Sequence, residues 1–302
     1  MKNKVIALIY KDKGFESEIS AQTSQAIEKV FKELSYSYFL VPADKNLFQV
    51  LLDKKPDLAF LAVHGPYGED GCLQGICEML SIPYTGSGVL TSSICMDKIF
   101  FKKYCIQNQI ATPDFFEISE ENTSQNITQY PVVIKASHGG STLGTSIVKD
   151  KKNLELSIEN SKKIGRFVFA EDYISGQEVA VSYLDGQILT PLEIVPKGGF
   201  YDYKRKYEKG LSEYHIPAKL DPFVLEKIKN ISEKVFSLLN VRGYGRADFL
   251  VENKKTPWLL EVNTLPGLTQ TSLLPKSAAH DKISFQELIQ KIINCATRDY
   301  AF

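Results

Sequence analysis

The chain has 302 residues, enough for about two domains of typical size, each with its own hydrophobic core. Hydrophobic residues make up 43% and charged residues 24%, which excludes a disordered chain, a fibrous protein and a small disulfide-stapled scaffold. The 36 basic and 36 acidic residues cancel, so no net charge would attract nucleic acid or an anionic membrane.

The first hundred residues alternate between strand and helix patterns. Their apolar spacing predicts strands at 4–10, 38–41 and 58–63 and helices at 18–34, 46–53 and 70–80. This alternation favours a parallel sheet with helices on its faces. We therefore expect an α/β domain at the amino terminus.

After a predicted helix over 91–108, the pattern changes mostly to strands. We expect strands at 131–135, 144–148, 167–170, 178–184 and 187–195, then a helix at 221–239, a hairpin at 244–263 and a helix at 284–296. Residues 196–217 contain four tyrosines and four lysines without an apolar period, and loops of this length usually serve as lids or binding loops. The later part is predicted to be α+β.

The sequence also predicts where the protein works. No stretch approaches the roughly 18 consecutive apolar residues of a membrane span, and no signal-peptide cleavage region follows the first apolar run. The five cysteines form no Cys-x-x-Cys pair, which predicts reduced thiols rather than zinc ligands or disulfides. We expect a cytoplasmic protein.

The predicted hairpin carries a polar cluster typical of a magnesium site. If the turn is centred on 254–255, Asp248 lies opposite Glu261 and Arg246 lies opposite Asn263, all on one face. The other face would carry Ala247, Phe249, Leu260 and Val262. Two carboxylates and an amide are hard oxygen ligands that suit Mg²⁺, and the arginine could hold developing negative charge. A solvated polar face is the alternative, although opposed carboxylates repel unless a cation lies between them.

The loop at 135–144 lies between two predicted strands and contains three glycines. Glycines allow successive backbone N–H groups to surround a phosphate, while Lys135 adds charge and Ser141 and Thr142 add hydroxyl groups. The loop lacks the Gly-Lys-Ser/Thr ending of a Walker loop. A flexible hairpin tip is the alternative.

Two further clusters suggest nucleotide binding. Glu171 ends an apolar strand and could accept a hydrogen bond from an adenine amino group, while Glu178 could accept bonds from ribose hydroxyls. Solvated turn charges are the alternative. In the loop at 196–217, Lys206 and Tyr207 could close over an anionic substrate and exclude water.

Three other enzyme classes lack their motifs. The first strand is not followed by Gly-x-Gly-x-x-Gly, which argues against a nicotinamide-dependent dehydrogenase. The four histidines are scattered without ligand-like spacing, which argues against a zinc hydrolase. No Gly-x-Ser-x-Gly elbow marks a serine hydrolase.

Together these clusters resemble the ATP-grasp ligases, and among them the D-alanine–D-alanine ligases, over nearly the whole chain. The resemblance is carried by motifs at 16–20, 64–71, 96–98, 135–144, 201–207, 245–248, 260–269 and 272–273. It implies an ATP-grasp fold of mixed α/β and α+β class. The implied domains are a parallel-sheet α/β domain over 1–93, a central α+β domain over 94–174 and an antiparallel-sheet α+β domain over 175–302, with ATP between the last two.

The resemblance also implies roles for individual residues. ATP would contact Lys98, Lys135, Ser137, Gly140, Thr142, Glu171, Glu178 and Lys206. Two Mg²⁺ ions, which Mn²⁺ could replace, would be bound by Asp248, Glu261 and Asn263. D-alanine would be bound by Glu16, His64, Arg246, Gly267, Ser272 and Leu273. The catalytic residues would be Glu16, Ser141, Tyr207 and Arg246.

The implied activity is ATP-dependent ligation of two D-alanine molecules through an acyl phosphate, for peptidoglycan precursor synthesis. The protein would be a homodimer that binds neither nucleic acid nor membranes. Tyr207 favours the dipeptide, because relatives that make D-alanyl-D-lactate replace the lid tyrosine. The alternatives are another ATP-grasp carboxylate–amine ligase, a D-alanine–D-lactate ligase, or a non-catalytic ATP-binding protein, which would not need Arg246. The chain departs from the family at 11–14, where Lys-Asp-Lys-Gly replaces the usual Gly-Gly and Ser, and at His138 and Thr142.

Overall fold

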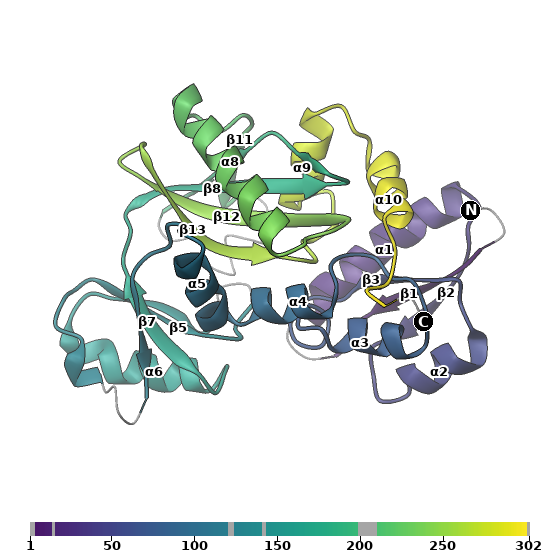
Figure 1. The fold of residues 1–302 in the computed structure, drawn as a ribbon, viewed down its shortest axis with the longest axis horizontal. Coiled ribbons are helices and arrows are strands. Elements are labelled where there is room, and N and C mark those ends of the chain that lie inside the picture. The colour runs from purple at the N-terminus through teal and green to yellow at the C-terminus, as the bar shows by residue number, and fades with distance from the viewer. Residues whose placement is uncertain (1–3, 14–15, 120–123, 141–142, 199–209, 301–302) are drawn as a thin grey trace.

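The structure, a computed structural model, describes residues 4–13, 16–119, 124–140, 143–198 and 210–300. The described strands form three sheets, taken from successive parts of the chain. Figure 1 shows the amino-terminal sheet on the right, a second sheet at the lower left and the largest sheet above them. The predicted mixture of parallel and antiparallel sheets is confirmed.

The amino-terminal sheet is parallel, with strand order β2-β1-β3. Its elements are β1 (Val5–Tyr10), α1 (Ser17–Glu33), β2 (Ser37–Pro42), α2 (Leu47–Lys54), β3 (Leu58–Ala62) and α3 (Cys72–Met79). All six match the predicted alternation. β3 is buried along its whole length, as expected for a strand covered on both faces.

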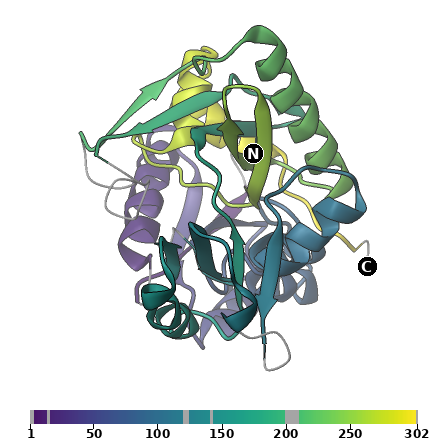
Figure 2. The same cartoon turned by 90° about the vertical axis from the view of Figure 1, so that its left-hand side faces the viewer.

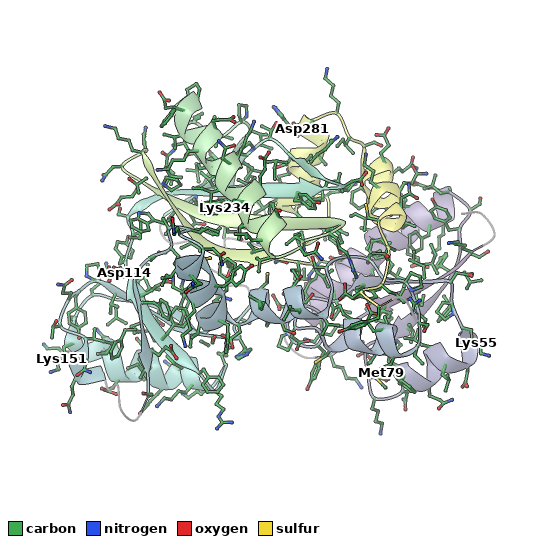
Figure 3. The ribbon with its side chains drawn as sticks, in the orientation of Figure 1. Lys55, Met79, Asp114, Lys151, Lys234 and Asp281 are labelled. Atoms are coloured by element: carbon green, nitrogen blue, oxygen red, sulfur yellow. The ribbon has the colours of Figure 1, made fainter. Side chains whose placement is uncertain are left out.

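The carboxy-terminal helices complete the core of this first sheet. They are α9 (Leu273–His280), which was not predicted, and α10 (Phe285–Asn294), which was. Leu288 and Ile292 of α10 share one apolar cluster with Phe31 of α1 and Phe60 of β3. At the end of α9, the carboxylate of Asp281, labelled in Figure 3, accepts hydrogen bonds from the backbone N–H and hydroxyl of Thr190.

The single helix predicted over 91–108 is wrong. The structure has two helices there, α4 (Val89–Met96) and α5 (Lys98–Gln107), separated at Asp97. The backbone of Asp97 is extended, and its side chain accepts hydrogen bonds from the backbone N–H groups of Ile99 and Phe100. A carboxylate in this position satisfies N–H groups that a helix leaves without partners, so it starts a new helix.

The second sheet is antiparallel, with order β4-β7-β5-β6. Its strands are β4 (Phe115–Ile118), β5 (Val132–Ala136), β6 (Thr145–Val148) and β7 (Val168–Asp172). Helix α6 (Leu154–Lys162) and two short 3₁₀ helices, η1 (Ser124–Asn126) and η2 (Lys151–Asn153), lie in the same region. β4 and α6 were not predicted. In α6 only Leu154, Ile158 and Ser161 are buried, which is too few apolar residues for a clear period.

The third sheet is also antiparallel, with order β11-β10-β8-β12-β13, and β9 pairs with β8. The strands are β8 (Gly176–Leu184), β9 (Gln187–Ile188), β10 (Leu192–Pro196), β11 (Ser212–His215), β12 (Tyr244–Glu252) and β13 (Thr256–Asn263). The apolar side of α8 (Pro222–Leu238) covers one face. Figure 2 shows the second sheet, in teal, below this third sheet.

Two predictions in this part need correction. The strand predicted over 187–195 is divided into β9 and β10. The loop predicted over 196–217 is shorter at its end, because β11 pairs with β10 through residues 212–215. Residues 199–209 lie outside the described part of the chain.

The structure bears on the cysteines and on membrane spans. All five cysteines are free thiols, of which Cys77, Cys95 and Cys105 are buried and Cys72 is exposed. Within the described ranges, none of the helices combines the length and the apolar character that crossing a membrane would require.

Candidate active site

A cavity of about 970 Å³ is lined by strands of the second and third sheets, by α1 and by the segment that follows β3 of the first sheet. It brings together the predicted residues Glu16, His64, Lys98, Lys135, Gly140, Glu171, Glu178, Arg246, Asp248, Glu261, Asn263, Gly267, Ser272 and Leu273. The predicted residues Ser141, Thr142, Lys206 and Tyr207 lie outside the described part of the chain. The volume is at the upper end of the usual range for small-molecule sites.

Ser137 is placed differently from its prediction as an ATP contact. Its side chain is fully buried, and it is not among the residues that line the cavity. Its hydroxyl donates to Asp97 Oδ1 at 2.5 Å and accepts from the backbone N–H of Ile99 at 3.2 Å. Ser137 therefore fixes the start of α5, which carries Lys98, instead of facing the cavity.

The β12–β13 hairpin has the predicted register at the site. Asp248 pairs with Glu261 and Arg246 pairs with Asn263. The turn is one residue tighter than predicted, since the pairing beyond the site is centred on Lys254. A β-bulge next to Asp248 compensates for the difference.

The bulge also corrects the predicted face of one leucine. Leu260 is the residue of β13 without a pairing partner, and it lines the cavity next to Glu261. Leu259 takes the buried position that was predicted for Leu260. An extra residue in one strand shifts the alternation of side chains by one, so the bulge reverses the face of the residues beyond it.

Each predicted metal-binding carboxylate faces a cation of the protein. The Arg246 guanidinium donates from Nε to Asp248 Oδ1 and from Nη2 to Oδ2, both at 2.7 Å. Lys98 Nζ lies 3.2 Å from Glu261 Oε2 and donates to the carbonyl oxygen of Gly139 at 2.7 Å. Positive charge therefore already occupies the space between the carboxylates and the glycine loop.

The donor set suits Mg²⁺ only in part. Among the described residues, no group of three or more His, Cys, Asp or Glu side chains is placed to hold a metal ion. Asp248 and Glu261 supply carboxylate oxygens, and Asn263 supplies an amide oxygen that also accepts from the N–H of Leu265 at 2.9 Å. Hard oxygen donors fit Mg²⁺, which usually completes its shell with water and substrate phosphates.

Glu171 lies in the cavity wall between two lysines. Its carboxylate is 5% exposed, forms an ion pair with Lys135, and lies 3.0 Å from Lys102 Nζ. Burial disfavours the charged form, but the two lysines outweigh it and hold the pKa of Glu171 below its usual value. Burial lowers the pKa of Lys102, and Glu171 opposes that effect.

Sequence reasoning missed Lys102, although a signal was present. Lys102 follows Lys98 by four residues, so both lie on the same face of α5. Lys103, one position on, is half exposed and pairs with Glu117 at 2.6 Å. Helical spacing could therefore have separated the inward lysine from the outward one.

Glu16 lies directly before α1, with a left-handed backbone at φ 64° and a side chain that is 8% exposed. A methyl group on Gly65 would come within 2.3 Å of Glu16 Oε2, and one on Gly140 within 3.1 Å. The carboxylate is therefore enclosed between the 64–71 motif and the glycine loop. Both glycines leave room for it because they have no side chain.

His64 lines the cavity next to this carboxylate, but both ring nitrogens have protein partners. Nε2 lies 3.1 Å from the Thr23 hydroxyl, and Nδ1 lies 3.5 Å from Glu69 Oε1. Burial, with the nearby charge of Glu16, raises the pKa of Glu69, although His64 opposes this. Thr23 and Glu69 were not predicted as site residues, although Glu69 lies within the 64–71 motif.

The start of α9 forms the end of the cavity. Ser272 precedes the helix, and its hydroxyl accepts from the Thr269 N–H at 3.1 Å and lies 2.8 Å from the Thr269 hydroxyl. A methyl group on Gly267 would lie 2.8 Å from the Ser272 hydroxyl. The first N–H groups of a helix lack partners within the helix, so this end of the cavity suits a carboxylate.

Comparisons with known proteins agree over nearly the whole chain. A family model described as "D-ala D-ala ligase C-terminus" matches residues 106–294, and one described as "D-ala D-ala ligase N-terminus" matches residues 48–87. The chain is 40% identical to the D-alanine–D-alanine ligase of Syntrophotalea carbinolica, over 97% of this chain and 96% of the relative. It is 39% identical to that of Aquifex aeolicus, over 95% and 99%. The solved structure of the Bacillus anthracis ligase complexed with ATP matches with a TM-score of 0.85 and 31% identity, covering 97% of both chains.

Proposed function

Because the chain belongs to the D-alanine–D-alanine ligase family, we propose that its cavity is the site at which ATP drives the joining of two D-alanine molecules. The chain is an ATP-dependent, ADP-forming ligase that makes D-alanyl-D-alanine for peptidoglycan synthesis. The observation that supports the placement is that one cavity collects fourteen predicted site residues, which come from motifs far apart in the chain.

ATP is proposed to lie between the second and third sheets. Glu171 accepts the adenine amino group, and Glu178 on β8 accepts ribose hydroxyls. Lys98 and Lys135 contact the phosphates, and the backbone at Gly140 approaches them closely because no side chain intervenes. Thr142 and Lys206, outside the described ranges, are proposed to add to the phosphate contacts.

Asp248, Glu261 and Asn263 are proposed to hold two Mg²⁺ ions, which Mn²⁺ could replace. When bound, the ions neutralise charge on the phosphates during transfer. Before the ions bind, Arg246 holds the carboxylate of Asp248 in position and Lys98 holds that of Glu261. The positive charges of both side chains remain beside the phosphoryl group that is transferred. Phosphoryl transfer needs this kind of fixed positive charge more than it needs a nucleophilic side chain.

The first D-alanine is proposed to place its ammonium group on Glu16, with His64 and Glu69 supporting that carboxylate. Its own carboxylate oxygen attacks the γ-phosphorus of ATP, the bond to the β-phosphate oxygen breaks, and ADP leaves an acyl phosphate behind. Arg246 stabilises the negative charge that develops on the acyl oxygen when the second substrate attacks the acyl carbon.

The second D-alanine is proposed to place its carboxylate on the Ser272 hydroxyl and the N–H of Leu273, beside Gly267. Its free amine attacks the acyl carbon, a tetrahedral intermediate forms, and phosphate leaves as the peptide bond is completed. Ser141 and Tyr207 are proposed to close the site, because water would otherwise hydrolyse the acyl phosphate.

We also propose a domain division at 1–93, 94–174 and 175–302, in which α9 and α10 pack back onto the first domain. A cytoplasmic homodimer is proposed as the working form. Sedimentation of the purified protein tests the dimer, and a single species with the mass of one chain would contradict it.

The ligation itself is tested by following ADP release with ATP and Mg²⁺, with and without D-alanine. We expect release only when D-alanine is present, in equal amount to dipeptide detected by mass spectrometry. Adding D-lactate to a limiting amount of D-alanine distinguishes the products, and we expect no mass corresponding to D-alanyl-D-lactate. ADP release without D-alanine, or without dipeptide, would contradict the proposed use of this cavity.

A further inference from the structure

Lys102 is a buried cation behind the cavity to which the proposed reaction gives no role. It is 1% exposed, and it is not among the residues that line the cavity. Its Nζ lies 3.0 Å from Glu171 Oε2 and donates to the hydroxyl of Thr112 at 2.8 Å. A lysine is seldom buried so completely unless its charge is paired.

Glu171 is shared between this lysine and Lys135. The two lysines contact different oxygens of the carboxylate, Lys102 at Oε2 and Lys135 at Oε1. Glu171 on β7 pairs with Val133 on β5, so Lys135, two residues further along β5, projects from the same face of the sheet. Lys135 lines the cavity, whereas Lys102 approaches the carboxylate from α5 behind it.

Binding of ATP therefore affects the two lysines differently. The triphosphate carries more negative charge than one carboxylate, so Lys135 is drawn toward it. If Lys135 were the sole counterion of Glu171, either the lysine would be held away from the phosphates or the carboxylate would be left buried and unpaired. A buried carboxylate that loses its partner pays a large desolvation cost or takes up a proton. A protonated or displaced Glu171 would no longer be a fixed acceptor for the adenine amino group.

We propose that Lys102 is a positioning residue for ATP, which keeps Glu171 ionised and aimed into the cavity while Lys135 contacts the phosphates. The inference rests on the placement of ATP proposed above. Lys102 touches no substrate atom and acts only through Glu171. Thr112 holds Lys102 in turn, because its hydroxyl fixes the position of Nζ.

The test is Lys102→Met in the full-length enzyme, since methionine keeps the length of the side chain without its charge. KM is measured at saturating D-alanine for ATP and for the triphosphate of purine riboside, which lacks the 6-amino group. We expect KM for ATP to rise about tenfold or more, the typical effect of losing a hydrogen bond to a charged group. We expect a much smaller rise for the purine nucleotide, and an unchanged KM for D-alanine.

The matched control is Lys103→Met, the same substitution one position further along α5. This side chain is 51% exposed and pairs with Glu117 on the surface. We expect neither nucleotide KM to change in this variant. A purely structural role of Lys102 would raise both KM values equally or only lower the melting temperature, and either result overturns the inference.

Two further variants decide the matter if Lys102→Met fails to fold. Thr112→Val retains the charge but removes the partner that orients it, so we expect a smaller loss of preference for ATP over the purine nucleotide. An unchanged preference in a folded Thr112→Val enzyme overturns the inference.

Glu171→Gln tests the proposed placement of ATP separately from the role of Lys102. If Glu171→Gln leaves KM for ATP unchanged, the proposed placement of ATP is wrong. If it removes the preference but the lysine and threonine variants do not, only the role of Lys102 is wrong.

Discussion

Lys98 Nζ lies 3.2 Å from Glu261 Oε2, and this ion pair joins the start of α5 to the hairpin of the third sheet. The two residues are separated by more than 160 positions in the chain. Asp97 starts α5, and Ser137 of the glycine loop holds Asp97, so the position of the lysine depends on the glycine loop as well as on α5. The pair places a positive charge where the proposed reaction brings phosphate and metal together.

Glu261→Gln should raise the Mg²⁺ concentration needed for half-maximal activity by about 10- to 100-fold, because a metal ligand loses its charge. The Mg²⁺ dependence of ADP release at saturating ATP and D-alanine measures this. Glu252→Gln, at the far end of the same hairpin, is the control and should leave the Mg²⁺ dependence unchanged. The same Mg²⁺ requirement in the Glu261 variant and the wild type would remove this residue from the metal site.

Gly65→Ala should impair binding of D-alanine, because the added methyl group would come within 2.3 Å of Glu16 Oε2. We expect KM for D-alanine to rise, with a smaller change in KM for ATP. Gly186→Ala is the control, since Gly186 also has a positive φ but a methyl group there would meet no atom within 4 Å. Both variants should lose about 1–2 kcal/mol of stability from backbone strain. Equal KM values in the two variants would show that the enclosure of Glu16 is unimportant.

Lys276 should make stability depend on pH in the alkaline range. Burial lowers the pKa of Lys276 from 10.5 to about 8, while its Nζ lies 4.6 Å from the centre of the Tyr214 ring. Between these two values the unfolded chain binds more protons than the folded one, so the free energy of unfolding should rise with pH from about 8 to 10.5.

Lys276→Met removes this contribution. The difference in unfolding free energy between wild type and variant, measured in urea, should therefore shift in favour of the wild type as the pH rises through this window. A constant difference from pH 7.5 to 10.5 would show that the lysine is not perturbed in the folded protein.

Arg242→Ala should destabilise the fold by separating the end of the chain from the first sheet. The side chain is 17% exposed, pairs with Asp299, donates to the Gly86 carbonyl oxygen at 3.1 Å and lies 5.0 Å over the Tyr84 ring. The combined loss is expected to be about 3 kcal/mol in urea unfolding. Lys29→Ala is the control, because its pair with Glu33 is long and 75% exposed on the lysine side. It should cost less than about 0.5 kcal/mol, and equal losses in both variants would contradict this account.

The β12–β13 hairpin shows which features of the site the alternation of residues along a strand can predict. Alternation along β12 and β13 correctly predicts that Asp248 faces Glu261, because opposed residues on one face follow from the two-residue period. The turn was placed half a residue too far along, and the bulge at Leu260 restores the same pairing. The bulge could not be predicted, since nothing in the alternation of residue types marks the position at which a strand takes an extra residue.

Residue types and their spacing are enough to indicate the chemistry available to this protein. The glycine loop, the opposed carboxylates, the lysines and the order of the motifs are properties of residue type and spacing, so they predicted the family, the fold class and the reaction. The missed helix α9 begins at Leu273, which was predicted only as a substrate contact. Short elements of this kind carry too few residues for a readable period.

Tertiary structure alone decided which of these charges are buried and which partners they have. Lys102 and Lys103 are identical neighbours in the sequence, yet one is fully buried against Glu171 and the other is half exposed. Tertiary structure likewise decides the partner of Ser137, whose hydroxyl donates to Asp97 at the start of α5 and does not face the cavity. Burial and pairing depend on the surroundings that distant segments provide, because desolvation and Coulomb attraction act through space and not along the chain.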